Sequence, residues 1–374
     1  MKNVESRQSQ KLERKHRKKR KRRIFLGLLL IFVAGIVFFL FRAFGSFSNM
    51  LEAIHNEVDT ISLRDKEVKT KSSDPISILL LGVDYGEEES RSLADGGRTD
   101  TMLVLTINPK TKSTTLVSLP RDTYAEIIGH NTYEKINHAY AYGGAAMSIN
   151  TVQNLLQVPI DYYVEVSMDG MKGIVDAIGG IDIYNDFDFT FDDLHFPVGE
   201  QHLDGMFALA YSRMRYEDPN GDFGRQVRQQ KVIKAILQKA ISLDSIMNYQ
   251  SVFDTLENNV RTNLTMNDLI DLQQNYLSSV SDFTQETLHA HDMYVDDLST
   301  FYISKQELLR ISNQLRRSLN LNELTYDEFK SLYVPGMSET FDGLDKDDNV
   351  VIDTPYYYRN DNGELYETTG VFGY

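Results

Sequence analysis

One uninterrupted apolar segment near the N-terminus constrains this chain more than any other feature. Residues 24–41 are 18 consecutive uncharged, mostly apolar residues, which is the length that a helix needs to cross the hydrocarbon core of a bilayer. The stretch directly before it, KLERKHRKKRKRR, is almost entirely basic. Because basic flanks stay in the cytoplasm, we expect a cytoplasmic tail over 1–23 and a single transmembrane helix over 24–44. The remaining chain is then extracytoplasmic, and the protein is a single-pass type II protein of the cell membrane.

Two other interpretations of this N-terminal region are weaker. A cleaved signal peptide has an apolar core of about 7–15 residues that ends at a small-residue cleavage site, whereas this run is longer and is followed by Phe41, Arg42 and Phe44. The basic stretch alone is also typical of a nucleic-acid-binding tail. Next to a membrane span, topology and contact with anionic lipids explain it more simply.

The charge is divided unevenly along the chain. Residues 1–44 hold 13 of the 39 Lys and Arg residues but only 2 of the 54 acidic residues, which leaves a net charge of −26 on the remainder. A domain this acidic repels nucleic acids and anionic membrane surfaces as a whole. We therefore expect no nucleic-acid partner, and any anion site must be built locally. The absence of cysteine excludes a disulfide framework and a thiolate metal site.

Strand and helix patterns interleave after a polar stalk that we place at residues 45–75. Continuous apolar or β-branched runs predict strands, and the turn-like NPKTK sequence at 108–112 predicts that two of them form a hairpin. Periodic apolar residues and N-terminal capping signals predict helices. The expected strands are 78–83, 101–107, 114–119 and 162–166, and the expected helices are 144–156, 203–214 and 226–243, with further helices that Asp169, Thr265 with Asp268, and Ser304 with Glu307 would cap.

This interleaving predicts an α/β fold, namely a layered α-β-α domain with a central mixed β-sheet flanked by helices and preceded by the transmembrane helix. We place the domain at residues 76–335, with its core motifs at 76–242. The remaining residues, 336–374, are acidic and rich in Tyr. They predict a final strand followed by a loose tail.

Arginine placement is the most informative feature of the expected domain. Only seven arginines fall between residues 76 and 242, and six of them lie in three short motifs. The first is GRTDT at 97–101, the second is LPRDT at 119–123, and the third combines SRMR at 212–215 with DFGRQVRQQ at 222–230. Each motif lies at an expected strand end or helix start, where functional residues are common.

The chemistry of these motifs suits a phosphate ligand. The guanidinium group offers a rigid fork of donors that matches phosphate oxygens. Arg225 and Gln229 lie four residues apart and share a helix face, and the start of that helix adds backbone N–H donors. Asp84 and Asp100 are typical Mg²⁺ anchors beside a phosphate. The residues alone predict a pyrophosphate or polyphosphate site; the alternative is that the arginines form only structural salt bridges.

Six segments together resemble the LytR-CpsA-Psr family. They are GVD at 82–84, GRTDTM at 97–102, SLPRDTY at 118–124, KINHAYAYGG at 135–144, LDGMFALAYSRMR at 203–215 and GDFGRQVRQQ at 221–230. With the basic tail and single anchor, the resemblance covers roughly residues 20–242. Members of this family attach anionic glycopolymers, such as wall teichoic acid or capsular polysaccharide, to peptidoglycan in Gram-positive bacteria. The resemblance implies a Mg²⁺-dependent phosphotransferase that takes the polymer from a polyprenyl-pyrophosphate carrier and forms a phosphodiester bond.

The resemblance also implies roles for individual residues. Mg²⁺ would be held by Asp84 and Asp100, and the membrane lipid tail of the donor would occupy an apolar groove. Catalytic roles would fall to Arg98, Arg121 and Asp222, and pyrophosphate binding to Lys135, Arg213, Arg215, Arg225 and Gln229. Arg228 matches the motif and would brace its helix. The acidic loop between Asp84 and Arg98 is longer than the family minimum, and residues 243–374 match no motif, so the polymer identity stays open.

Three other functions are alternatives to the phosphotransferase function. A non-catalytic polyprenyl-pyrophosphate-binding regulator would use the same arginines, but binding alone needs no metal pair. A lipid pyrophosphatase would use water as the acceptor. A transcription attenuator that acts on nucleic acid conflicts with the outside topology and the negative charge. The histidines show no zinc-hydrolase or Ser–His–Asp arrangement, and the Gly96–Gly97 and Gly143–Gly144 pairs fit turns rather than a phosphate-binding loop.

Overall fold

The computed structural model describes residues 52–84, 97–241, 257, 259–279, 282–332, 356–359 and 365–368. The predicted cytoplasmic tail at 1–23, the predicted transmembrane helix at 24–44 and the acidic loop at 85–96 lie outside these residues. Within the described ranges, no helix has the length and apolar character required to cross a bilayer. Residues from Ala53 onward belong to one folding unit, and this unit is described below.

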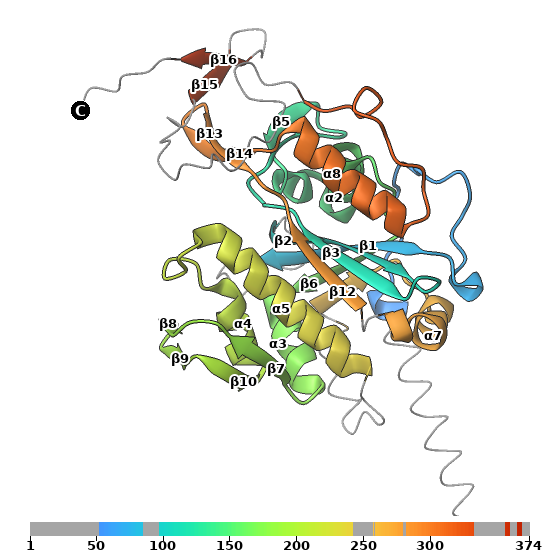
Figure 1. Cartoon of the computed structure of the whole chain (residues 1–374), viewed down its shortest axis with the longest axis vertical. Helices are drawn as coiled ribbons and strands as arrows, with labels where there is room; N and C mark the ends of the chain where they lie inside the picture. The colour runs from blue at the N-terminus through green and yellow to red at the C-terminus, as the bar shows by residue number, and fades with distance from the viewer. Residues whose placement is uncertain are drawn as a thin grey trace, which may run out of the picture. The chain divides into compact units, whose positions relative to one another are not determined.

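A six-stranded mixed sheet forms the centre of the domain (Figure 1). The β1–β2, β2–β3 and β6–β11 pairs are antiparallel, whereas β1–β6 and β3–β12 are parallel. The predicted hairpin between residues 101–107 and 114–119 is confirmed as β2–β3. In spatial order the strands are β11 (Val260–Thr262), β6 (Tyr162–Ser167), β1 (Ile76–Asp84), β2 (Arg98–Asn108), β3 (Ser113–Ser118) and β12 (Asp282–Thr287).

Helices cover both faces of the sheet, which confirms the predicted α-β-α layering. One face carries α2 (His138–Leu156) and α8 (Lys305–Ser318). The other face carries α3 (Met168–Ala177), α5 (Gly221–Ile241) and α7 (Met266–Asn275), and α4 (Gly205–Arg213) packs on α3 and α5. We call these the α2/α8 face and the α5 face.

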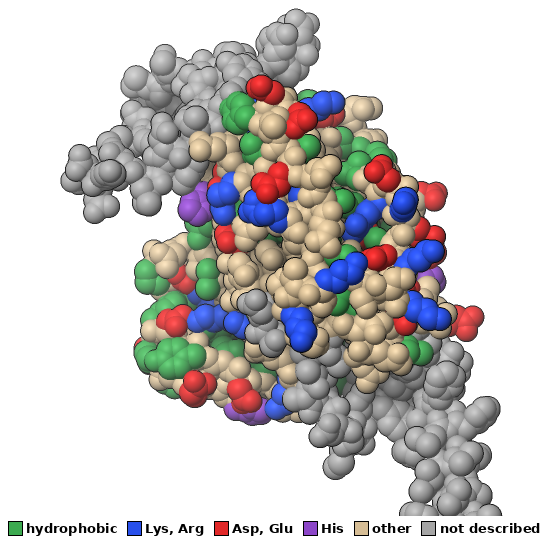
Figure 2. All heavy atoms as spheres, turned by 45° about the vertical axis from the view of Figure 1, so that its right-hand side comes forward, with side chains coloured by type: hydrophobic (Ala, Val, Ile, Leu, Met, Phe, Trp, Pro, Cys, Tyr) green, Lys and Arg blue, Asp and Glu red, His purple; other side chains and the backbone are tan. Residues whose placement is uncertain are grey.

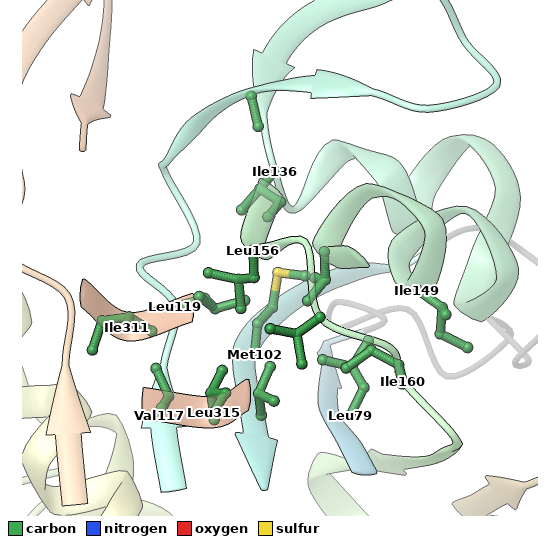
Figure 3. Close-up of a cluster of buried hydrophobic side chains, with 14 of the residues drawn as sticks. Leu79, Met102, Val117, Leu119, Ile136, Ile149, Leu156, Ile160, Ile311 and Leu315 are labelled. Carbon is green, nitrogen blue, oxygen red and sulfur yellow. The ribbon is translucent and has the colours of Figure 1, made fainter. Parts of the chain in front are cut away.

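The α2/α8 face holds a dry, closely packed core (Figure 3). Alternate strand residues such as Leu79, Met102 and Val117 point into it and meet Leu156 of α2 and Leu315 of α8, and none of these five side chains is more than 1% exposed. Because side chains alternate across a strand, their sequence neighbours point to the α5 face. The same three strands therefore supply two different apolar layers.

Short strands that were not predicted from the sequence lie outside the central sheet. A small layer around Phe189, Phe196 and Tyr211 supports α4 and α5. It contains β7 (Ile181–Asn185), β8 (Phe189–Phe191), β9 (Leu194–Phe196) and β10 (Gly199–Leu203). The hairpin of β4 (Tyr124–Ile127) and β5 (Thr132–Lys135) precedes α2. A four-stranded sheet contains β13 (His291–Val295), β14 (Leu298–Tyr302), β15 (Tyr356–Arg359) and β16 (Leu365–Thr368), so the predicted C-terminal tail supplies two strands rather than one.

Several helix boundaries differ from the predictions for local reasons. Helix α3 is capped by Ser167, whose hydroxyl accepts from the Gly170 N–H, and not by Asp169. Helix α5 begins at Gly221 rather than near Gln226. The range of α2 joins two helical pieces across a kink at Gly143 and Gly144, so the helix predicted from Gly144 is found after the kink, and a separate turn over 138–142 precedes it.

The two predicted capping boxes have different outcomes. The pair of Thr265 and Asp268 forms a complete box at α7. At α8, Ser304 accepts from the Glu307 N–H as expected. The Glu307 carboxylate, however, accepts from the His289 N–H and from Arg310 instead of returning to the cap. A buried carboxylate of this kind is held by its tertiary partners rather than by its own helix end.

The described part of the predicted stalk packs along the domain. Ile54 is buried, and Asn150 of α2 accepts a hydrogen bond from the Ile61 N–H. Arg64 forms a two-pronged ion pair with Asp161, with distances of 2.8 and 2.6 Å. The folded unit therefore begins before the boundary that we placed at residue 76. On the face seen in Figure 2, basic and acidic side chains are interspersed and do not gather into one basic patch.

Candidate active site

A β-bulge in the pairing of β1 with β2 turns Asp100 toward the α5 face. Thr101 pairs with Gly82, but Thr99 pairs with Val83, so Asp100 has no cross-strand partner on β1. Without this extra residue, Asp100 would follow the alternation of Met102 and point into the α2/α8 core. Instead, Asp100 and Thr101 both line a cavity on the α5 face.

Gly82 permits the close strand approach at this bulge. A Cβ atom at position 82 would lie 2.9 Å from the Cβ of Thr101, closer than two such atoms can pack. The glycine of the GVD segment, which also carries Asp84, is therefore required by the close strand packing at the bulge, whether or not a ligand is bound.

The cavity beneath the sheet is long, apolar and about 640 Å³ in volume. Strand residues that alternate with those of the α2/α8 core form its roof, and α5, α7 and α3 form its floor and walls. Its apolar lining includes Ile78, Leu80, Leu103, Leu105, Val164, Ile174, Ile233, Leu237 and Leu272. A cavity with this lining suits a hydrocarbon chain.

Polar side chains gather at one part of this cavity. Asp100 and Arg121 come from the ends of neighbouring strands, and the others come from the α4–α5 region; they are Arg213, Arg215, Arg225 and Gln229. Three sequence motifs spread over residues 97–230 therefore meet at one place, as the phosphate-site interpretation requires. We call this group the arginine cluster.

Arg121 is the most strongly paired member of the cluster. Its guanidinium donates to the Asp100 carboxylate, and Asp122 lies 3.7 Å from its Nε. Burial alone would lower the pKa of Arg121, but the carboxylates of Asp100, Asp122 and Asp222 outweigh it and raise the pKa. Arg121 is thus permanently charged and fixed in place.

Arg225 is buried beside the cluster and is held by Asp222. Its Nη2 donates to Asp222 over 2.6 Å, and Gln226 donates to the other carboxylate oxygen over 3.2 Å. Arg215 Nε lies 3.6 Å from the same carboxylate. Burial lowers the pKa of Arg225, the Asp222 charge opposes this, and the nearby Arg121 charge lowers it further. Two like charges held this close favour an anionic ligand.

Two buried donors of the cluster make no hydrogen bond within the described part of the chain, although Asp122 lies 3.7 Å from one of them. They are the Nε–H groups of Arg121 and Arg225. Buried charged donors without a partner are rare in folded proteins, because each forfeits its hydration without a replacement. The pair of them in one group of arginines indicates a ligand with several oxygen acceptors.

Arg228 does more than brace its own helix. Its side chain is buried and donates to the backbone carbonyls of Tyr211 and Met214 and to the Asp218 carboxylate. These contacts fix the segment that carries Arg213 and Arg215 against α5. Gly224 is required here, since a side chain at that position would collide with the Asp218 carboxylate. The sequence analysis missed Asp218, although its position just before the GDFGR motif was a usable signal.

The remaining predicted residues lie at the edge of this group. Asp84 and Arg98 are cross-strand partners at the ends of β1 and β2, next to the bulge, and neither lines the cavity. Lys135 lies 2.9 Å from Asp122 and so joins the cluster through Arg121. Arg213 is exposed and lies 4.0 Å from Asp192. The structure therefore brings all the predicted residues to one end of the sheet, with Arg98, Asp84 and Lys135 in an outer position.

The predicted metal ligands are the carboxylates of Asp84 and Asp100. No group of three or more His, Cys, Asp or Glu side chains suited to a metal ion occurs among the residues that the structure describes. Asp84 and Asp100 belong to the same end of adjacent strands. Two carboxylates are a donor set that fits Mg²⁺ when phosphate oxygens and water supply the other ligands.

Comparison with known proteins identifies the family. The protein-family model described as the LytR_cpsA_psr family matches residues 37–317 of this chain. The chain therefore belongs to this family, which confirms the resemblance drawn from its six motifs.

Individual relatives match over most of their own length. Polyisoprenyl-teichoic acid–peptidoglycan teichoic acid transferase TagU of Bacillus subtilis (strain 168) is 40% identical over 312 residues, which are 83% of this chain and 99% of TagU. A solved structure described as TagT bound to LIIa-WTA is 29% identical, with a TM-score of 0.60, over 71% of this chain and all of that one. A crystal structure from Enterococcus faecalis described as a transcriptional regulator is 40% identical, with a TM-score of 0.62, over 70% of this chain and 93% of that one.

Proposed function

We propose that this protein transfers an anionic glycopolymer of the teichoic acid class from a polyprenyl-pyrophosphate carrier to peptidoglycan. The observation that carries this proposal is the union of two opposite environments in one site. A long apolar cavity opens at a cluster of arginines with two unsatisfied buried donors. Few biological molecules place a long hydrocarbon chain directly next to a pyrophosphate, and polyprenyl-pyrophosphate carriers are among them. The relationship to TagU supports the choice of polymer and acceptor.

The residues of the site fit the chemistry of this transfer. A hydroxyl oxygen of the acceptor bonds to the phosphorus nearer the glycan, and the bond from that phosphorus to the bridging oxygen breaks. Polyprenyl phosphate leaves with the electron pair, and the hydroxyl proton passes to a base. Negative charge grows on the bridging oxygen and on the oxygens around the attacked phosphorus. Arg121 and Arg225, already fixed by Asp100 and Asp222, stabilise that charge without moving.

Asp222 fits a positioning role in this scheme. Its two carboxylate oxygens accept from Arg225 and from Gln226, and it is buried. A carboxylate engaged in this way holds guanidinium groups in place. Arg98, which we expected to be catalytic, would act on the outer side of the pyrophosphate, beside its cross-strand partner Asp84.

Mg²⁺ dependence forms part of the proposal. Asp84 and Asp100 would hold the ion, and bound Mg²⁺ would neutralise charge on the pyrophosphate oxygens. The extracytoplasmic location is likewise proposed, and it rests on the basic stretch before residue 24. A polyprenyl carrier requires a site beside a membrane, so the anchor and the cavity support each other.

The experiment uses the full chain in detergent with a labelled polyprenyl-pyrophosphate-linked glycopolymer and purified peptidoglycan. We expect label in the peptidoglycan, polyprenyl phosphate as the second product, and loss of both products when Mg²⁺ is chelated. Cleavage at the same rate without peptidoglycan would instead identify a lipid pyrophosphatase. Retention of the intact donor without turnover would identify a binding regulator.

A further inference from the structure

Four side chains next to the arginine cluster have no role in the transfer described so far. His130 and Glu134 come from the β4–β5 hairpin, and His138 and Tyr142 come from the first turns of α2. His138 and Tyr142 belong to the KINHAYAYGG motif, which the pyrophosphate chemistry does not use beyond Lys135, and Glu134 directly precedes it. None of the four lines the apolar cavity.

This group and its sequence neighbours connect to Arg121 and Arg98 in three ways. Lys135, between Glu134 and His138, pairs with Asp122 at 2.9 Å, and the Asn137 N–H donates to the Arg121 carbonyl over 3.3 Å. Tyr142 also lies within electrostatic reach of Arg98: the hydrogen bond to Glu134 and burial raise the pKa of its hydroxyl, and the Arg98 charge opposes them. The group therefore lies on the outer side of the site, beyond Arg121 and Arg98.

The rings of this group are fixed in place, and those of His130 and Tyr142 are exposed. Glu134 accepts from the Tyr142 hydroxyl and pairs with His138 Nδ1, each at 2.8 Å. His130 stacks on Tyr142 with ring centroids 3.8 Å apart and planes within 5°. Tyr142 is nevertheless 44% exposed. An aromatic surface that is both held rigid and exposed to solvent is prepared for contact with a ligand.

The helix is interrupted directly after Tyr142, which allows this surface to form. Gly143 has φ of −149° and Gly144 has φ of 59°. A Cβ at position 143 would lie 2.8 Å from atoms of Met147. The glycine pair thus separates the turn that carries His138 and Tyr142 from the rest of α2, which packs in the core. Tyr140 packs in the core of the α2/α8 face, so the core holds this turn while the kink redirects it.

We propose that His130, Glu134, His138 and Tyr142 form a sugar-binding subsite on the glycan side of the pyrophosphate. This inference rests on the proposed function. With the hydrocarbon chain in the cavity and the pyrophosphate at the arginine cluster, the sugar rings lie outside the cavity mouth. The stacked rings offer a flat apolar surface to the C–H face of a pyranose, and His138 and the Glu134 carboxylate offer polar groups at its rim. The sugar belongs either to the donor or to the peptidoglycan acceptor, and the test separates the two.

The test measures transfer by the full chain while donor and acceptor are varied in turn. Tyr142→Ala removes the stacking surface, and we expect KM for one of the two saccharide substrates to rise roughly tenfold. An increase for the acceptor assigns the subsite to peptidoglycan, and an increase for the donor assigns it to the first sugar of the polymer. Tyr142→Phe keeps the ring and loses the bond to Glu134, so a smaller increase is expected. Tyr184→Ala changes a tyrosine that is 53% exposed on β7 and serves as the matched control.

A direct binding measurement keeps this inference independent of the transfer activity. A soluble peptidoglycan disaccharide and a lipid-free sugar pyrophosphate taken from the donor are titrated onto the wild-type chain and onto the variants. Weaker binding of one probe to Tyr142→Ala and His130→Ala, with unchanged melting temperatures, supports the subsite even if no transfer is detected. If Tyr142→Ala does not fold, His130→Ala and Tyr142→Phe decide the question. Unchanged KM values and unchanged binding in the folded variants would overturn the subsite and leave the transfer function standing.

Discussion

The two faces of the central sheet differ in how completely they are filled. On the α2/α8 face, Leu79, Met102 and Val117 meet two helices in a core that excludes solvent. On the α5 face, Ile78, Leu103 and their neighbours are just as apolar, but they border a cavity of about 640 Å³. Similar residue types on the same strands thus produce a stable core on one side and a binding site on the other. Substitutions on the α2/α8 face should therefore mainly change stability, and substitutions on the α5 face should mainly change activity.

The largest expected effect is on activity, at the mouth of the α5 face. Arg225→Lys keeps the positive charge but loses the forked geometry that Asp222 positions. Removing one preorganised donor to a developing oxyanion typically lowers the rate by about a hundredfold or more, and we expect a loss of that order in the transfer rate. Arg317→Lys changes an exposed arginine paired with Glu323 and should leave the rate within twofold. Equal rates in the two variants would contradict the role of the cluster.

The next effect separates the faces by stability. Leu315→Ala empties space in the closed core, where Leu315 is fully buried, and should lower the free energy of unfolding by about 2–5 kcal/mol. Leu237→Ala enlarges a cavity that already exists, so we expect a loss below about 1.5 kcal/mol. Denaturant unfolding of the two variants makes the comparison. Similar losses would mean that the α5 face is packed as tightly as the other.

Filling each face should give opposite results. Ile233→Phe places a larger side chain in the cavity of the α5 face and so reduces its free volume. We expect this variant to retain less of a polyprenyl-phosphate probe, while its melting temperature stays unchanged or rises. Val152→Phe adds similar volume to the closed core, where Val152 is fully buried, and overpacking should destabilise the fold by about 1–3 kcal/mol. A destabilised Ile233→Phe variant that still retains the probe would contradict the view that the α5 face holds a ligand cavity and the α2/α8 face a closed core.

The smallest effect is a pH dependence that belongs to the α2/α8 side. Burial alone would raise the pKa of Glu307, but hydrogen bonds from Arg310 and from the His289 N–H outweigh it and lower the pKa. The unfolded chain therefore binds this proton more readily than the folded one. The resulting stability is present above about pH 4.5 and disappears as the pH falls through the folded pKa, by about 1.4 kcal/mol for each unit of pKa difference.

Glu307→Gln should reduce this acid dependence. Melting temperatures measured between pH 6 and pH 3 should fall less steeply for Glu307→Gln than for the wild-type chain, although the variant is less stable at pH 6. Glu323→Gln, which alters an exposed pair with Arg317, should keep the wild-type slope. A wild-type slope in both variants would show that Glu307 carries no linked stability.

The sequence predicted the strands and helices with strong local signals. Apolar runs identified β1, β2, β3 and β6 because buried strands need them. The Thr265–Asp268 box at α7 was equally legible. The short strands β7 to β10 lacked a long apolar run, and their pairing depends on the aromatic cluster that α4 and α5 bring from elsewhere. Such strands are determined by tertiary contacts and not by their own sequence pattern.

The candidate site was predicted in its members but not in its geometry. Residue type and spacing were sufficient to select Arg121, Arg225 and Asp100. They could not place Asp100, because strand alternation assigns it to the wrong face unless the bulge is known. They also missed Asp218, which acts through Arg228 and belongs to no motif. Register shifts and buried partners of site residues follow from pairing across the fold, which one strand or helix does not encode.

The parallel pairing of β3 with β12 has a consequence for how the chain is made. β3 ends at Ser118, and its neighbour begins at Asp282, so synthesis of the second must wait for more than 160 further residues. During that interval the β3 edge offers unpaired backbone groups to any other chain nearby. Long-range parallel pairing is also slow to form. A nascent chain of this family member therefore needs to be held apart from its neighbours until residue 287 has emerged, and truncated products should aggregate before they can fold.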